Sequence, residues 1–106
     1  DVYVNIVGGV RVGETAADLG IAVAVLSSAR NLPLDPGLCV FGEIGLAGEV
    51  RAVPMAERRL EEAARMGLSH CLIPRHNLDR ALPDFSSLRV SGLHALEDLT
   101  EKLAMR

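Results

Sequence analysis

The stretch Phe41-Gly-Glu-Ile-Gly-Leu-Ala-Gly-Glu-Val-Arg-Ala-Val-Pro54 decides how this chain folds. It begins within an apolar run over residues 38–44, which predicts an interior strand. The turn residues at 45–48 end that strand, because two glycines flank a short Leu-Ala pair. The chain then returns through a second strand over 49–53, so the stretch predicts a β-hairpin.

Helices are expected on both sides of this hairpin. Thr15 can cap the first helix, with Asp18 at its third helical position, and the following run over 19–29 is apolar almost all round. Such a helix is expected to be buried on more than one side. The second helix is expected over 55–66, with charged and apolar residues on opposite faces, and Gly67 closes it.

The remaining segments complete an alternating pattern of strands and helices. In chain order, we expect a strand over 2–7, a loop over 31–37, a strand over 68–73, a polar loop or short helical turn over 75–84, a short edge strand over 88–90, and a last helix from 92 or 93 to about 104. The resulting order βαββαβ(β)α predicts an α+β fold with a mixed sheet packed against helices.

Size and charge limit what the domain can do. Its 106 residues suit a single domain with one core. The formal net charge of −3 excludes a domain that is a polycation as a whole, so DNA binding would need a local patch. The sequence opens directly in a strand-like segment without an initiator Met, and we therefore expect it to be a fragment of a longer protein.

Cysteine usage predicts a reducing environment. Cys39 and Cys71 each lie inside an apolar, strand-like run. Two cysteines without a dense disulfide framework predict buried free thiols. The sequence has no signal peptide and no membrane-spanning run, so a soluble cytoplasmic protein is expected.

The side chains for hydrolytic chemistry are poorly placed. A Ser-Lys hydrolase needs a neutral lysine amine beside a serine hydroxyl. The sole lysine, Lys102, lies near the end of the last predicted helix, where a cation offsets the helix dipole. Asp18 and Glu57 are the one carboxylate pair suited to acid–base work, but each also lies in a first helical turn, where a negative charge is stabilised.

The histidines and glycines fit no familiar metal or nucleotide site. His70, Cys71 and His76 lack the spacing of common zinc sites, and strand alternation points His70 and Cys71 to opposite faces. The glycines between residues 8 and 13 lack the Walker lysine and the G-x-G-x-x-G spacing. No metal or cofactor is therefore expected in this domain.

Ten of the eleven cationic residues are arginines, whose planar fork suits phosphate. Biased amino-acid usage explains the same preference. The scarcity of aromatic residues argues against base stacking, so nucleic acid would be contacted through its phosphates. The candidates for DNA binding are Arg11, Arg51, Arg58, Arg59 and Arg75. The alternative is that these arginines are ordinary solvated charges paired with nearby acids.

Four motifs together carry a resemblance to a known family. They are Val4-Asn-Ile-Val-Gly-Gly9, Glu14-Thr-Ala-Ala-Asp-Leu19, the stretch 41–51, and Glu62-Ala-Ala-Arg-Met-Gly67. They resemble the C-terminal domain of the RadA (Sms) family of bacterial DNA-repair ATPases, which are related to RecA. The resemblance covers nearly the whole chain. It implies the fold of the Lon proteolytic domain, which is similar to domain 2 of ribosomal protein S5.

The resemblance also implies that the catalytic site is degenerate. It places the catalytic serine of Lon-type proteases at Asp18 and their catalytic lysine at Glu57. Because both halves of the dyad are replaced, no catalytic residue is expected, and the domain resembles a pseudo-protease.

In this family, a zinc finger and a RecA-like ATPase precede the Lon-like domain, so zinc, magnesium and ATP would be held outside this chain. Members of the family form hexameric rings that encircle DNA and drive branch migration in homologous recombination. The implied partners are DNA, further copies of the chain and a RecA-type recombinase, without a membrane. Three functions stay open: a non-catalytic assembly and DNA-contacting domain, a pure oligomerisation scaffold, and a residual Lon-like serine peptidase.

Overall fold

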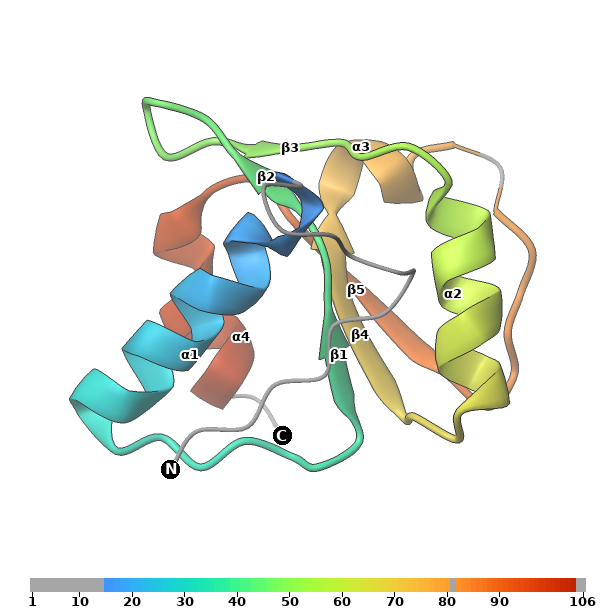
Figure 1. Cartoon of the computed structure of the whole chain (residues 1–106), viewed down its shortest axis with the longest axis horizontal. Coiled ribbons are helices and arrows are strands. Elements are labelled where there is room, and N and C mark those ends of the chain that lie inside the picture. Colours follow the sequence, from blue (N-terminus) through green and yellow to red (C-terminus); the bar gives the residue numbers. More distant parts are fainter. Residues whose placement is uncertain (1–14, 81, 105–106) are drawn as a thin grey trace.

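Three parallel strands form the centre of the domain. In the computed structural model, β1 (Leu38–Val40), β4 (His70–Pro74) and β5 (Arg89–Leu93) pair in the order β1-β4-β5 (Figure 1). The structure describes residues 15–80 and 82–104. Because the strands run in the same direction, their carboxyl ends meet at one edge of the sheet and their amino ends at the other.

Helices cover both faces of this sheet. The 3-10 turn η1 (Thr15–Ala17) leads into α1 (Asp18–Arg30), which lies with α4 (Leu99–Ala104) on one face, while α2 (Ala56–Arg65) covers the other (Figure 1). Alternate strand residues supply the two hydrophobic clusters, because successive side chains point to opposite faces. On the α2 side the fully buried strand residues are Cys39, Cys71 and Ile73, and on the α1 and α4 side they are Val40, Leu72 and Leu93.

The predicted hairpin is present, but the strand that leads into it is interrupted. Strands β2 (Glu43–Ile44) and β3 (Val50–Arg51) pair antiparallel in a sheet of their own. Between β1 and β2, the Gly42 N–H donates to the Ala16 carbonyl (2.9 Å), and the Gly42 carbonyl accepts from the Leu19 N–H (3.0 Å). A side chain at Gly42 would come within 3.0 Å of Leu19 Cδ2. The single strand expected over 38–44 is therefore wrong, because the start of α1 takes the backbone groups of its middle.

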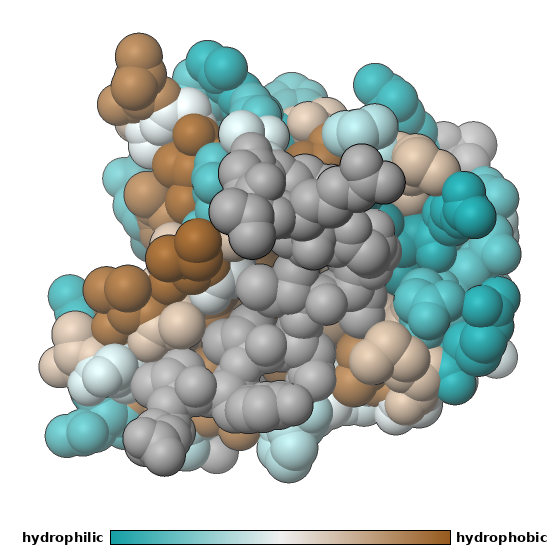
Figure 2. Space-filling view, in the orientation of Figure 1, coloured by the Kyte–Doolittle hydropathy of each residue, from teal (hydrophilic) through white to brown (hydrophobic). Residues whose placement is uncertain are grey.

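The expectation that the first helix is buried on more than one side is also wrong. Leu19 and Val23 are fully buried against the sheet, but Ile21 and Val25 are 58% and 62% exposed. The helix packs through one face and leaves apolar side chains on the other. Figure 2 shows this apolar surface over α1 and at the hairpin turn, whereas the surface over α2 is mostly hydrophilic.

Helix α2 agrees with the prediction to within one residue at each end, and Gly67 closes it in a left-handed conformation (φ +77°). The short helical turn is also present, as α3 (Arg75–Leu78). The last helix begins later than predicted. The preceding residues extend β5 and then form the 3-10 turn η2 (Leu96–Asp98), which the Asp98 carboxylate stabilises by accepting from two backbone N–H groups.

The α+β class is confirmed: the described residues form four α-helices and contain both parallel and antiparallel strand pairs. The strand and glycine turn predicted over 2–9 lie outside the described residues. None of the helices in the described part of the chain is long and apolar enough to cross a membrane.

The prediction of free thiols is wrong, because Cys39 and Cys71 form a disulfide. The parallel register places them directly opposite each other on neighbouring strands, with their Cα atoms 4.7 Å apart. Both are fully buried beneath α2. The sequence does not reveal this pairing, since it depends on which strands become neighbours.

Candidate functional site

Asp18, where the resemblance leads us to expect the Lon-type nucleophile position, forms a hydrogen bond with the backbone. It is the first residue of α1, and its Oδ2 accepts a hydrogen bond from the backbone N–H of Ile44 (3.2 Å). The carboxylate thereby ties the start of α1 to the hairpin. A negative charge at this end of a helix is also stabilised by the exposed N–H groups of the first turn.

Glu57, where the resemblance leads us to expect the Lon-type lysine position, is exposed in the first turn of α2. Helices α1 and α2 cover opposite faces of the sheet (Figure 1), and no hydrogen bond in the described part of the chain joins the two carboxylates. The structure therefore shows Asp18 engaged with backbone and Glu57 open to solvent.

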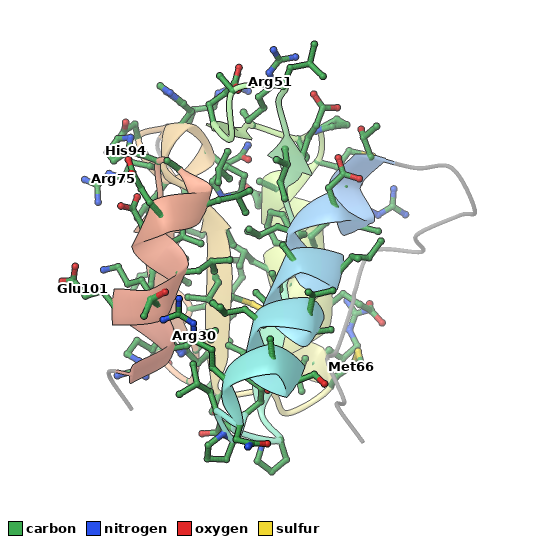
Figure 3. All side chains as sticks on the ribbon, turned by 90° about the vertical axis from the view of Figure 1, so that its left-hand side faces the viewer. Arg30, Arg51, Met66, Arg75, His94 and Glu101 are labelled. Atoms are coloured by element: carbon green, nitrogen blue, oxygen red, sulfur yellow. A yellow bond between two sulfur atoms is a disulfide. The ribbon has the colours of Figure 1, made fainter. Side chains whose placement is uncertain are left out.

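Two of the candidate arginines lie at the carboxyl ends of the parallel strands, and both are paired with acids. Arg51 contacts Glu49 (3.1 Å) and Glu43 (3.7 Å), and Arg75 contacts Asp79 (3.1 Å). Figure 3 shows Arg51 and Arg75 at the same end of the molecule. These carboxylates largely offset the positive charge of the two arginines. The ion pairs are solvent-accessible, so each contributes little to stability.

The Glu49 carboxylate also accepts from the Ala47 N–H (3.0 Å). Backbone hydrogen bonding, followed by the hydrogen bond from Arg51, lowers the pKa of Glu49 from its usual value. This carboxylate therefore stays ionised and holds the hairpin turn together with Arg51.

The other candidate arginines differ in exposure. Arg58 is exposed on α2, and Arg11 lies outside the described residues. Arg59 is only 4% exposed; its Nε donates to the Pro54 carbonyl (3.1 Å), and its guanidinium lies over the Phe41 ring, 5.8 Å from the centroid. Arg59 thus packs α2 onto the sheet and leaves almost no surface for a phosphate.

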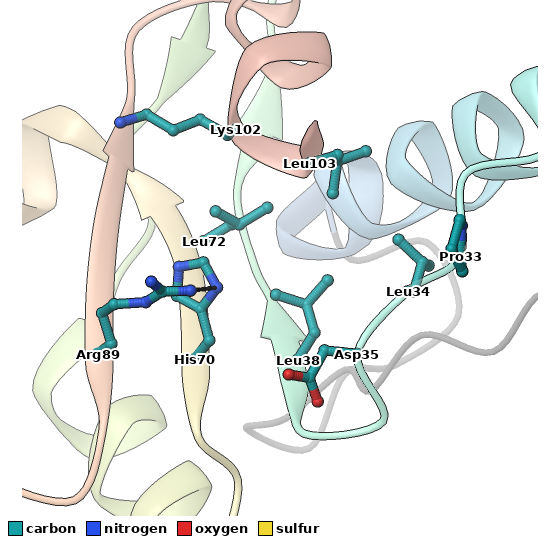
Figure 4. Close-up of a pocket in the computed structure, with 9 residues that line it drawn as sticks. All are labelled: Pro33, Leu34, Asp35, Leu38, His70, Leu72, Arg89, Lys102 and Leu103. Carbon is teal, nitrogen blue, oxygen red and sulfur yellow. Dashed lines mark hydrogen bonds between the residues drawn. The ribbon is translucent and has the colours of Figure 1, made fainter. Parts of the chain in front are cut away.

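A second group of cations, which the sequence analysis did not select, gathers at the amino ends of β4 and β5. A cavity of about 30 Å³ opens there (Figure 4). Its lining residues are Pro33, Leu34, Asp35, Leu38, His70, Leu72, Arg89, Lys102 and Leu103. These residues come from a loop, all three parallel strands and α4, so no local motif marks the cavity.

The geometry fixes the protonation of His70. Arg89 Nη2 lies 3.2 Å from His70 Nδ1, and because a guanidinium only donates, Nδ1 must be the acceptor. The proton of the neutral ring then lies on Nε2, which donates to Ser91 Oγ at 2.9 Å. Burial lowers the pKa of His70, and the nearby charge of Arg89 lowers it further, while Asp35 acts in the opposite direction.

The side chains of His70, Cys71 and His76 do not come together as a metal site. Cys71 is in the disulfide, so its thiolate is not available, and His70 is engaged by Arg89 and Ser91. Within residues 15–80 and 82–104, no group of three or more His, Cys, Asp or Glu side chains is placed to hold a metal ion.

One buried polar residue was missed entirely. Asn77 is 1% exposed, and its side chain accepts from the Val53 N–H (2.9 Å) and donates to the Val53 carbonyl (3.0 Å). It thereby fixes the segment between β3 and α2. No sequence pattern singles out Asn77, because its partner lies 24 residues away.

Comparison with known families places the chain. The sequence model of the family described as subunit ChlI of Mg-chelatase matches residues 2–77. The chain belongs to this family. The match includes Asp18 and Glu57 and fits the predicted Lon-like region of this ChlI-family chain.

The ChlI-family chain is also similar to bacterial proteins named DNA repair protein RadA. It is 45% identical to that of Escherichia coli (strain K12) over 98 residues, which cover 92% of the chain and 21% of the relative. It is 46% identical to the RadA of Pseudomonas aeruginosa over 103 residues (97% of the chain, 22% of the relative). For Halalkalibacterium halodurans the identity is 46% over 102 residues (95% and 22%).

The predicted resemblance to RadA is confirmed, and the relatives are DNA repair proteins. The chain spans about a fifth of the length of these curated relatives. The similarity therefore concerns one domain of a longer type of protein.

Proposed function

We propose that this chain is a non-catalytic assembly and DNA-contacting domain of a RecA-related hexameric ATPase that acts in homologous recombination, branch migration and DNA repair. The observation that carries the proposal is the similarity to DNA repair proteins over 92–97% of the chain. The ATPase, with its ATP, magnesium and zinc, would lie in other domains of the protein in the cytoplasm. A RecA-type recombinase would be a further partner.

The non-catalytic part of the proposal rests on the residues at the dyad positions. A Ser-Lys peptidase needs a hydroxyl nucleophile and a neutral amine that removes its proton. Asp18 supplies a carboxylate that already accepts from Ile44, and Glu57 supplies an acid. The sole lysine, Lys102, lies on α4 at the opposite end of the sheet. A fluorogenic peptide assay tests this point: turnover that Asp18→Ala or Glu57→Ala abolishes would restore the peptidase hypothesis.

The DNA-contacting part rests on exposed arginines. Arg51, Arg58 and Arg75 are accessible and would contact phosphates, together with Arg11. Arg59 is buried and is left out of this proposed surface. Contacts to phosphate position a protein on DNA without reading its sequence, which suits a domain that lines a ring.

A pure assembly scaffold is the second candidate, and the apolar surface of α1 favours it. Ile21 and Val25 are more than half exposed, and Leu46 at the hairpin turn is fully exposed. Exposed apolar side chains of this kind are typical of surfaces that bind another protein chain.

Neutralising the arginines in the full-length protein separates the two candidates. Arg11, Arg51 and Arg75 are each changed to Gln, and DNA affinity is measured against salt while the oligomer mass is recorded. Loss of affinity with intact hexamers would support DNA contact by this domain. Unchanged affinity with intact hexamers would favour the scaffold.

A further inference from the structure

The cavity at the amino ends of β4 and β5 is lined by two cations that have no acidic partner among the described residues. Arg89 is the first residue of β5, and Lys102 lies on α4. Both side chains line the cavity. In the described part of the chain, neither has a carboxylate within ion-pair distance, whereas Arg51, Arg65 and Arg75 all do. The positive charge of this site is therefore available to a ligand.

Most of the hydrogen-bond donors of the two cations are also available. A guanidinium has five N–H donors and an ammonium has three. Within the described residues, Arg89 uses its donors only toward His70 Nδ1, and Lys102 makes no hydrogen bond. His70 holds the guanidinium from one side, so the Arg89 fork is positioned before any ligand arrives.

Four leucines line the cavity beside its polar side chains. Leu38, Leu72 and Leu103 are buried, and Leu34 is partly buried (Figure 4). Apolar groups beside a charge lower the local polarity, which strengthens the attraction between a cation and an anion. Among the described residues, Asp35 is the only carboxylate in the lining, and it forms no ion pair with either cation.

The size of the cavity limits the ligand. Its volume of about 30 Å³ is close to the share of one water molecule in the liquid. A nucleotide base does not fit in this space, but oxygen atoms of one phosphate group can enter it beside the two cations that line it. The fork of an arginine matches two phosphate oxygens, and a lysine adds a point charge.

We propose that the Arg89–Lys102–His70 pocket binds one phosphate group, and that its source is the DNA backbone. The identity of this source rests on the proposed function, whereas the phosphate chemistry rests on the pocket alone. Arg89 and Lys102 contact the phosphate oxygens, and His70 is a positioning residue that orients the guanidinium.

The test uses two probes, inorganic phosphate and a short oligonucleotide, on the chain of 106 residues. Binding of each probe is followed by NMR of the His70 ring and the Arg89 side chain, and oligonucleotide affinity by fluorescence anisotropy. The variants are Arg89→Gln with Lys102→Gln, Arg89→Lys, and His70→Gln. Arg65→Gln is the matched control, because Arg65 is exposed but ion-paired with Glu62.

We expect both probes to shift the same His70 and Arg89 resonances and to compete with each other. The double variant should lose about tenfold or more in oligonucleotide affinity, since two phosphate-contacting charges are removed. Arg89→Lys should fall in between, and Arg65→Gln should bind as the parent does. His70→Gln should weaken phosphate binding less than the double variant does, and the double variant should abolish the shift of the His70 ring.

The remaining outcomes separate this inference from the proposed function. An oligonucleotide that binds without moving these resonances, and with equal affinity for the double variant, overturns the pocket and leaves the proposed function intact. Phosphate that moves them while the oligonucleotide does not bind overturns DNA as the source, and the proposed function fails with it. No response to either probe overturns the pocket.

Discussion

The two ends of the parallel sheet carry similar side chains in different states. At the carboxyl ends, Arg51 and Arg75 are held by neighbouring carboxylates at 3.1 Å. At the amino ends, Arg89 and Lys102 line a cavity, and neither has such a partner within residues 15–80 and 82–104. Residue type alone therefore does not identify a phosphate site. What distinguishes the two ends is whether the fold already neutralises the charge.

The largest expected effect comes from the disulfide that links β1 and β4 between the two ends. Cys39 and Cys71 are 32 residues apart, and closing a loop of this size stabilises a protein by about 3.7 kcal/mol. We expect reduction, or the double change of both residues to Ser, to lower the free energy of unfolding by this amount in urea titrations. Both ends should lose stability together.

Alkylation followed by mass measurement checks the premise. If the denatured, unreduced protein takes up two alkyl groups, the thiols are free and this prediction fails.

The next effect tests whether polar groups at the carboxyl end are structural. Asn77→Ala removes the side chain that satisfies the backbone N–H and carbonyl of Val53. Leaving buried polar groups unpaired costs about 2–3 kcal/mol in total, which urea unfolding would detect. At the other end, Arg89→Gln should change stability by less than about 0.5 kcal/mol, because the side chain is exposed. Equal losses of unfolding free energy in Asn77→Ala and Arg89→Gln would mean that the polar groups at the two ends of the sheet contribute alike to stability.

Asp18 and Glu57, the two positions where a Lon-type dyad is expected, should respond unequally to the same change. Asp18→Ala loses the hydrogen bond to Ile44 and the negative charge at the start of α1, so we expect a loss of about 1–2 kcal/mol. Glu57→Ala, at the start of α2, should lose about 0.5 kcal/mol at most. Thermal or urea unfolding measures both. A larger loss for Glu57 would contradict the structural role given to Asp18.

The salt dependence of DNA affinity compares the two ends of the sheet in binding rather than in stability. If the pocket contacts one phosphate, changing Arg89 and Lys102 to Gln should reduce the slope of log affinity against log salt by about 1. The same change at Arg51 and Arg75 should reduce it less, because their charges are already offset. Anisotropy titrations over a salt series give both slopes. The reverse order would locate the DNA contact at the carboxyl ends.

The sequence predicts those parts of the fold that local signals decide. The hairpin follows from its glycine turn, and α2 follows from charged and apolar faces that end at Gly67. It does not predict the interruption at Gly42, because the start of α1, distant in sequence, takes its hydrogen bonds. The exposed face of α1 is likewise missed, since apolar composition does not say how many sides are covered.

The pocket could not be predicted for the same reason. His70, Arg89 and Lys102 are isolated in the sequence, and only the parallel order β1-β4-β5 together with the return of α4 brings them to one cavity. The position of Lys102 near the end of the last helix was predicted, but the cavity beside it was not. Only the structure shows which charged side chains have a partner of opposite charge.

The smallest expected effect is the pH dependence that His70 imposes. Burial, and then the charges of Arg89 and Lys102, lower the pKa of His70 below its usual 6.5, while Asp35 opposes this shift. The folded state therefore binds this proton less well than the unfolded state does. Stability should be complete above about pH 6.5 and should fall as the pH drops through that value, because the unfolded state is then protonated first.

His70→Gln should flatten this fall in urea titrations between about pH 8 and about pH 5. His76→Gln, at an exposed position, is the control. A slope that survives in His70→Gln would mean that another group carries it. Protonation also removes the Nδ1 acceptor that holds Arg89. The pocket should therefore lose its preset geometry over the same pH range, which ties the stability of the amino end to the state of its one imidazole.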